Sequence, residues 1–181
     1  QGIADTMSSG TLEVQLTMIT RGFLGALDYN PYKYDLEQAK ALLAEAGVTG
    51  DTTFNMVVWN SPPYTDFAQA IQATLNLEVV DGKQWLTRYR NSDLDIWLGV
   101  WGPDYPDPHS NAKAFAVNAA DAPDGSPGLA DRFGWTNDEI SKATMAAVRE
   151  RDTATRQKTY DDIQRKHTLV SPFIYMFQEK R

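Results

Sequence analysis

The most regular hydrophobic pattern in the chain starts at Asp35. Apolar side chains then recur every three or four residues, which predicts an amphipathic helix over residues 35–46. Asp35 can cap the first turn, Gln38 completes a capping box, and Gly47 ends the helix. Residues 1–34 show no comparable period, so we expect mostly extended, irregular backbone there.

Strand and helix patterns alternate through the middle of the chain. Strands are predicted at 53–59, 77–80 and 94–101, with helices between them at about 67–75 and 83–90. The third strand is apolar on both faces, which is typical of the middle of a covered sheet. This alternation predicts an α/β layer with parallel strands. The pattern leaves almost no connection before the second strand, so either the preceding helix ends early or the chain lacks residues there.

The carboxyl-terminal part is predicted to be a long loop followed by two helices. Residues 103–134 are rich in Pro, Gly and Asp and predict a loop with one short helix near 111–116. Thr136 and Glu139 form a capping box for a longer helix. The remaining pattern predicts a helix to about residue 150, a helix over about 152–168 and a strand over 173–177.

The composition excludes several kinds of site and disfavours several kinds of partner. The 181 residues contain no cysteine, which excludes thiol catalysis, disulfides and cysteine–zinc sites. A formal net charge of -7 disfavours nucleic acid and anionic lipid as partners. No apolar run approaches the roughly 20 residues that cross a bilayer, so no membrane insertion is expected. Residues 1–5 have neither the basic start nor the apolar stretch of a signal peptide.

One loop, residues 101–108, concentrates the candidate chemistry. It follows the third predicted strand, and ligands bind at the carboxyl ends of strands in open α/β sheets. Two carboxylates, Asp104 and Asp107, stand among prolines that stiffen the loop. Trp101 and Tyr105 add two aromatic rings. A fixed carboxylate beside aromatic rings suits an ammonium or another cationic group.

Each candidate residue also has a structural interpretation. Asp104 can cap a turn, and Asp107, before Pro108, is typical of a helix start. Trp101 can pack in the core instead of forming a ligand wall. Tyr64 follows two prolines and can either line a cleft or pack.

The loop and four other segments resemble a known family. Trp-x-x-Asp-Tyr-x-Asp-Pro at 101–108 is similar to the loop of peptide/nickel-type (oligopeptide-binding-like, family 5) solute-binding proteins of ABC importers. The other segments that resemble this family occur in the same order, at 34–47, 68–75, 156–164 and 172–174.

The resemblance implies a periplasmic-binding-protein-like lobe of the α/β class, with a mixed, mostly parallel sheet flanked by helices. The chain would be a carboxyl-terminal lobe, with residues 1–34 as an irregular joining segment, 35–181 as a single ligand-binding domain, and the partner lobe absent. Its implied function is capture of a peptide-like or other small solute by hinge closure, for the membrane subunits of an ABC importer. The implied location is the periplasm, or the outer face of a Gram-positive membrane through a lipid anchor.

The resemblance also implies roles for individual residues. In peptide-binding relatives the first aspartate of the motif pairs with the ligand's amino terminus, and this role falls to Asp104. Trp101, Tyr105 and Tyr64 would be pocket walls, and Asp107 would cap or brace the loop. No catalytic residue, metal or cofactor is expected. Some dipeptide-binding relatives carry an arginine near the second helix that binds the carboxylate of the ligand. Residues 62–67 contain no arginine, which does not favour a dipeptide ligand.

Two alternatives belong to other classes of function. A hydrolase could use Asp104 and Asp107 as a carboxylate pair with His109 as a third group. No nucleophile motif, phosphate loop or metal-spaced histidine pair accompanies them, so an enzyme is not expected. A protein-interaction module without a small-molecule site is the other alternative.

Overall fold

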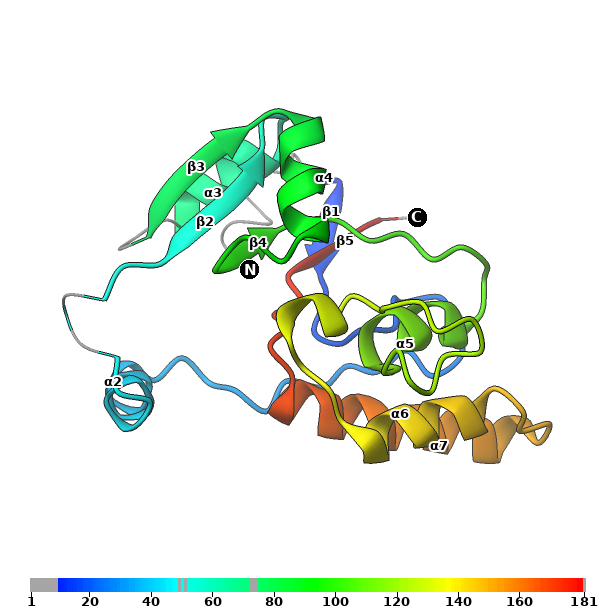
Figure 1. The fold of residues 1–181 in the computed structure, drawn as a ribbon. Helices are drawn as coiled ribbons and strands as arrows, with labels where there is room; N and C mark the ends of the chain where they lie inside the picture. The colour runs from blue at the N-terminus through cyan, green and yellow to red at the C-terminus, as the bar shows by residue number, and fades with distance from the viewer. Residues whose placement is uncertain (1–9, 49, 51, 72–74, 181) are drawn as a thin grey trace. The chain divides into compact units, whose positions relative to one another are not determined.

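The computed structural model describes residues 10–48, 50, 52–71 and 75–180 of the chain (Figure 1). The helices and strands follow in the order β1 (Leu12–Val14), α2 (Leu36–Glu45), β2 (Asn55–Trp59), α3 (Tyr64–Ile71), β3 (Asn76–Val80), α4 (Gly82–Arg90), β4 (Ile96–Leu98), α5 (Pro108–Ala116), the 3-10 helix η1 (Asp131–Phe133), α6 (Asp138–Ala147), α7 (Thr153–Val170) and β5 (Phe177–Glu179). The predicted α/β class with a parallel sheet is confirmed, as is the capping of α2 by Asp35.

Two predicted features are misplaced. The terminal strand expected at 173–177 is instead β5, which begins at Phe177 and pairs with β1. Helix α6 is capped by Asn137, whose side chain accepts from the Ile140 N–H, and not by Thr136.

The connection between α3 and β3 is only partly described. Helix α3 is described as far as Ile71 and β3 begins at Asn76, while residues 72–74 lie outside the described residues.

The chain divides into two compact units. Unit 1 combines residues 1–30 with 100–181, and unit 2 is residues 31–99. The sequence predicts one boundary, near residue 34, whereas the contacts between residues give two, near residues 30 and 99.

Unit 1 is built on α5, α6 and α7 and on the irregular backbone of residues 15–30. Its core joins these parts through the buried residues Met18, Ile19, Ala112, Ala116, Ile140, Ala147, Tyr160 and Ile163. Helix α7 also supplies polar partners for the irregular segment, since the Gln164 amide donates to the Gly25 carbonyl (2.6 Å) and accepts from the Ile19 N–H (3.2 Å). Buried backbone without regular structure needs such partners. Strands β1 and β5 form an antiparallel pair in the same unit.

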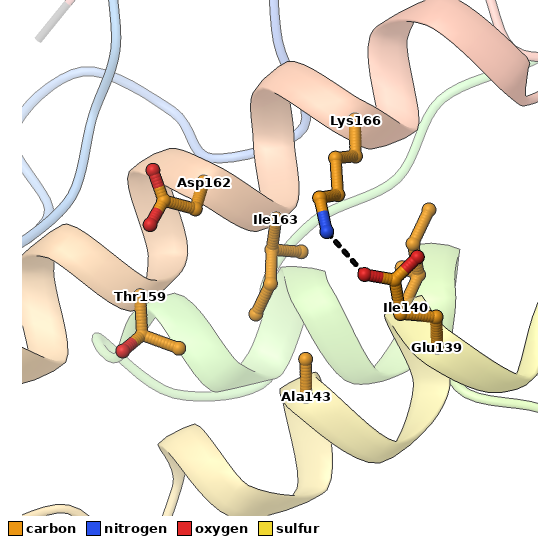
Figure 2. Close-up of a pocket in the computed structure, with 7 residues that line it drawn as sticks. All are labelled: Glu139, Ile140, Ala143, Thr159, Asp162, Ile163 and Lys166. Carbon is orange, nitrogen blue, oxygen red and sulfur yellow. Dashed lines mark hydrogen bonds and ion pairs between the residues drawn. The ribbon is translucent and has the colours of Figure 1, made fainter.

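Helices α6 and α7 pack together and leave a groove of about 200 Å³ (Figure 2). Its apolar lining comes from Ile140, Ala143 and Ile163, and an ion pair joins Lys166 to Glu139 at one side. Ligand pockets typically enclose about 300–1,000 Å³. The groove therefore fits the packing of two helices better than the capture of a solute.

Unit 2 contains a three-stranded parallel sheet in the order β3-β2-β4, with β2 in the middle. The third predicted strand, β4, is therefore at the edge of this sheet and not in its middle, as its apolar faces had suggested. Alternation along β2 decides what each face contacts. Met56 and Val58 join the apolar cluster that includes Ala68 of α3. Trp97 of β4, which pairs with Val57 on the other face of the sheet, instead stacks on Trp85 and Tyr89 of α4. Helices α3 and α4 therefore cover opposite faces of the sheet.

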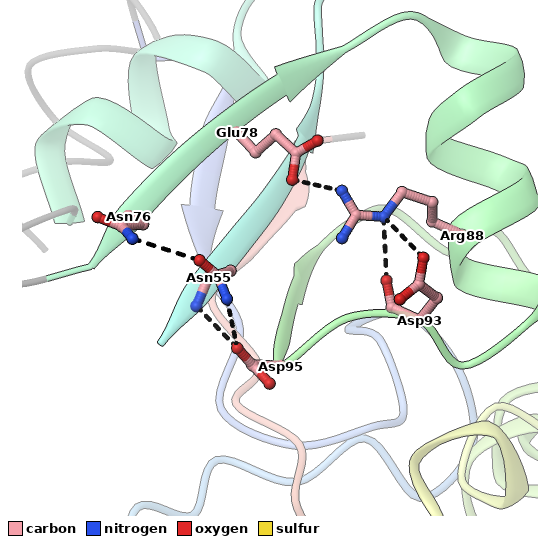
Figure 3. Close-up of polar contacts among 6 residues, drawn as sticks. All are labelled: Asn55, Asn76, Glu78, Arg88, Asp93 and Asp95. Carbon is pink, nitrogen blue, oxygen red and sulfur yellow. Dashed lines mark hydrogen bonds and ion pairs between the residues drawn. The ribbon is translucent and has the colours of Figure 1, made fainter. Parts of the chain in front are cut away.

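Polar contacts fix the amino ends of these strands in register (Figure 3). One carboxylate oxygen of Asp95, just before β4, accepts from both the backbone N–H and the side-chain amide of Asn55 at 2.9 Å. The side-chain amide of Asn76 donates to the side-chain oxygen Oδ1 of Asn55 at 3.4 Å. Arg88 of α4 pairs with Glu78 on β3 and, at 3.4 Å, with Asp93.

Candidate functional site

The loop at residues 101–107 leads directly into α5, and Asp107 forms the junction. Its carboxylate accepts from the His109 N–H at 2.8 Å, and Pro108 occupies the first turn of the helix. Proline suits this position because its missing N–H would be unsatisfied there in any case. The predicted helix-start role of Asp107 is therefore confirmed.

The Asp107 carboxylate also forms a two-pronged ion pair with Arg156 of α7. The guanidinium nitrogens lie 2.9 and 2.7 Å from the two carboxylate oxygens. Burial disfavours the charged carboxylate, but the hydrogen bonds from Arg156 and from the His109 N–H outweigh it and lower the pKa of Asp107. Asp107 is thus held ionised and fully engaged.

Asp104 has a different environment, although it is three residues away. Its backbone N–H donates to the Ser110 hydroxyl at 2.8 Å, which ties the loop to the first turn of α5. The residue is exposed, and no residue in the described part of the chain donates a hydrogen bond to its carboxylate. The carboxylate is therefore available to a ligand.

These environments argue against a catalytic carboxylate pair. A carboxyl with a lowered pKa carries no proton near neutral pH, so Asp107 does not fit the role of a general acid. His109 is buried, and burial lowers its pKa, while its Nδ1 lies 3.4 Å from the Tyr160 hydroxyl. The histidine belongs to the packing of α5 on α7.

The two aromatic rings of the loop are partly open to solvent. Trp101 is 38% exposed and meets Phe115 edge to face, with ring centroids 6.4 Å apart. Phe115 packs in turn against Phe173 and Tyr175, so the exposed indole rests on an aromatic cluster. Tyr105 is 45% exposed. Burial and the negative charges of the two aspartates raise the pKa of Tyr105, which places its hydroxyl in their field.

Tyr64 lies in unit 2, at the start of α3. It is half-buried and stacks on Trp59 with centroids 5.9 Å apart. Trp59 begins a row of rings that continues through Trp85 and Trp97 to Tyr89 at centroid separations of 6.0, 4.7 and 4.3 Å. Asp104, Trp101 and Tyr105 share one loop of unit 1, and a ligand-binding role for any of the four stays a prediction.

Sequence reasoning missed two residues of the loop's environment, Arg156 and Ser110. Arg156 belongs to a segment that resembles the family, but nothing local pairs it with an aspartate 49 positions earlier. Ser110 carried no signal beyond its place in the first turn of a helix that starts earlier than predicted.

Other kinds of site find no support in the described part of the chain. No three histidine or acidic side chains there are arranged to hold a metal ion. None of the described helices is both long and apolar enough to traverse a bilayer.

Comparison with known proteins gives a family match over most of the chain. The model of bacterial extracellular solute-binding proteins, family 5 Middle, matches residues 1–122. The chain is 26% identical over 188 residues to the probable D,D-dipeptide-binding periplasmic protein DdpA of Escherichia coli (strain K12), covering 99% of this chain and 35% of DdpA. It is 29% identical over 145 residues to di/tripeptide-binding protein 2 of Pseudomonas aeruginosa (strain UCBPP-PA14), covering 74% of this chain and 26% of that protein.

Solved structures share the fold. DppA from Helicobacter pylori, in complex with the peptide STSA, aligns with a TM-score of 0.81 at 22% identity, over 97% of this chain and 35% of that one. HbpA2 from Haemophilus parasuis aligns with a TM-score of 0.78 at 24% identity, over 98% and 36%. These likenesses confirm the predicted periplasmic-binding-protein-like fold, and the chain spans about a third of each of these two structures.

Proposed function

We propose that this chain, which belongs to the family 5 bacterial extracellular solute-binding proteins, supplies one wall of a solute-binding site. In this proposal Asp104 binds an ammonium group of the solute. Trp101 and Tyr105 line the wall beside it.

The observation that carries the proposal is the exposed carboxylate of Asp104, to which no residue in the described part of the chain donates a hydrogen bond. Its backbone is fixed by Ser110, and its neighbour Asp107 is fully engaged by Arg156. An exposed carboxylate on a fixed backbone, to which no described residue donates a hydrogen bond, loses no existing contact when it accepts a charged donor. The exposed rings of the loop suit the same cationic group.

The solute we propose is peptide-like or another amine-bearing small molecule. The relatives' names support this class, since they describe dipeptide-, D,D-dipeptide- and di/tripeptide-binding proteins. A similar structure that holds mannopinic acid indicates that the fold also accepts other solutes. Residues 62–67 contain no arginine, so a dipeptide carboxylate would need another partner.

We further propose that the whole protein acts outside the cytoplasmic membrane and passes its solute to the membrane subunits of an ABC importer. The periplasmic location in the name of the Escherichia coli relative supports this placement. The protein would release its solute unchanged, because the engaged Asp107 leaves no second carboxylate for acid–base chemistry.

The first prediction concerns Asp104→Asn in the whole protein that contains this chain. The substitution keeps the shape of the side chain and removes its charge. Charge-assisted hydrogen bonds contribute about 1.5–3 kcal/mol, so affinity for an amine-bearing peptide should fall by roughly 10- to 100-fold. Calorimetry with a panel of di- to tetrapeptides and their N-acetylated forms measures the loss.

Asp28→Asn is a matched control for this experiment. Asp28 is an exposed aspartate of unit 1 that lies outside the loop. Its substitution should leave affinity unchanged. Equal affinity of wild type and Asp104→Asn for every bound peptide would remove Asp104 from the site.

A further inference from the structure

We propose that Arg156 is a positioning residue for the carboxylate of Asp104, and that it leaves Asp104 as the one uncompensated charge of the loop. The inference rests on the proposed function and deepens it, because it says why the site suits a ligand with a single positive charge. Arg156 lies in α7, far from the loop in sequence.

A short path of contacts runs from Arg156 to Asp104. Arg156 holds both carboxylate oxygens of Asp107 at 2.9 and 2.7 Å. Asp107 caps α5 through the His109 N–H at 2.8 Å, which fixes the first turn of that helix. Ser110 belongs to this turn, and its hydroxyl accepts the Asp104 N–H at 2.8 Å. A displacement of Asp107 therefore moves the group that holds Asp104.

Arg156 is itself anchored on several sides. Its Nε donates to the Ala147 carbonyl at 3.2 Å, and its guanidinium carbon lies 5.3 Å from the centre of the Tyr160 ring. Only 15% of the side chain is exposed. The planar fork thus uses three nitrogens at once, a geometry that a lysine ammonium cannot reproduce.

The same pair sets the charge of the loop. Asp104 and Asp107 are the acidic side chains of residues 100–110, and Arg156 neutralises only Asp107. One net negative charge remains, which matches a single ammonium. A divalent cation would require several free oxygen ligands and finds one carboxylate. The loop therefore selects a monocationic amine over a divalent metal ion.

Substitution of Arg156 in the whole protein tests the inference. Arg156→Lys keeps the charge and loses the fork, and Arg156→Met loses both. Hydrogen exchange followed by mass spectrometry reports the loop directly, through peptides that contain residues 101–110. The loop amides should exchange about tenfold faster in Arg156→Met and by an intermediate factor in Arg156→Lys, because loss of a charge-assisted hydrogen bond shifts a local opening equilibrium by about that factor.

A binding measurement on the same proteins gives the preference for the free amine over the acetylated peptide, a ratio that general destabilisation of the fold does not change. The probes are Met-Leu, Ser-Thr-Ser-Ala and their N-acetylated forms. The preference for the free amine over the acetylated form should fall about tenfold in Arg156→Met and be partly rescued in Arg156→Lys. Arg149→Lys, on an exposed arginine, is the matched control and should change neither readout.

The outcomes separate this inference from the proposed function. Unchanged loop exchange in Arg156→Met overturns it, as does faster exchange throughout unit 1 without a local excess at the loop. If Asp104→Asn abolishes the amine preference and Arg156→Met does not lower it, the inference fails and the proposed function stands. If Asp104→Asn has no effect, or wild type binds neither peptide, the exchange measurement alone decides whether Arg156 holds the loop.

Discussion

His167 illustrates how burial sets the chemistry of a single residue. The imidazole has no exposed surface, its Nε2–H donates to the Phe115 carbonyl at 3.0 Å, and the Tyr175 hydroxyl approaches Nδ1 at 3.4 Å. Burial lowers the pKa of His167 to about 4, although the bond to Phe115 opposes the shift. The folded protein therefore keeps this histidine neutral.

Stability should decline as the pH falls from 7 toward 4.5. The unfolded chain takes up a proton on His167 near pH 6.5, whereas the folded protein takes it up only near pH 4. Because the unfolded state then binds more protons, this residue should contribute a loss of about 2 kcal/mol over that interval. Chemical denaturation at a series of pH values measures it.

His167→Gln separates this effect from other acid-sensitive groups. The variant should start out about 1–3 kcal/mol less stable at pH 7, because it disturbs buried hydrogen bonds. Its stability should then fall less steeply than that of wild type between pH 7 and 4.5. Parallel curves for the two proteins would contradict the burial argument.

At the residue scale, local signals were predictable from the sequence and distant partners were not. Asp107 was recognised as a helix start because Pro108 stands next to it. Arg156 was not connected to it, because the ion pair depends on how α7 packs on α5. The exposure of Asp104 likewise depends on tertiary contacts, because Asp107 and not Asp104 pairs with Arg156. The sequence around Asp104 does not reveal this.

Among the elements, α4 and the sheet of unit 2 depend on the row of stacked rings between them. Trp97 of β4 stacks on both Trp85 and Tyr89 of α4, with centroids 4.7 and 4.3 Å away. Gly99 lies beneath the Trp97 ring, and a Cβ added there would come within 1.9 Å of the ring's far edge. The ring cannot easily move aside, because it is stacked on two other rings.

Gly99→Ala should therefore destabilise unit 2. Overpacking of a filled site typically costs about 1–3 kcal/mol, and the near-ultraviolet circular dichroism of the tryptophans should change with it. Gly102→Ala is the matched control, since a Cβ there meets nothing within 4 Å. Similar unfolding free energies for the two variants would show that the row tolerates displacement.

Periodicity predicted the type of most helices and strands, but it failed where a strand forms only by pairing with a distant part of the chain. Residues 173–177 look like a strand because they are apolar. Phe173 and Tyr175 instead pack into the aromatic cluster around Phe115. The strand forms further along, at Phe177–Glu179, where β1 supplies a partner from the other end of the chain. The capping of α6 shifted by one residue because Asn137, a strong capping residue, directly follows Thr136.

For the whole molecule, the chain covers only 35% and 26% of the two curated relatives. A lobe that supplies one wall leaves a ligand open to water, and closure between two lobes is what buries it. We therefore expect this chain alone to bind the solute weakly or undetectably, whereas the whole protein binds it. Calorimetry on both forms makes the comparison, and micromolar affinity of the chain alone would contradict a shared site.

The pairing of β1 with β5 has a consequence for biosynthesis. Unit 1 is assembled from residues on both sides of unit 2, so the segment 31–99 interrupts it. During synthesis, all of unit 2 emerges from the ribosome before β5 (Phe177–Glu179) has been made. Strand β1 (Leu12–Val14) therefore has no pairing partner until the end of synthesis. Vectorial synthesis therefore favours unit 2 folding first and unit 1 closing last, which leaves β1 without its strand partner for longest.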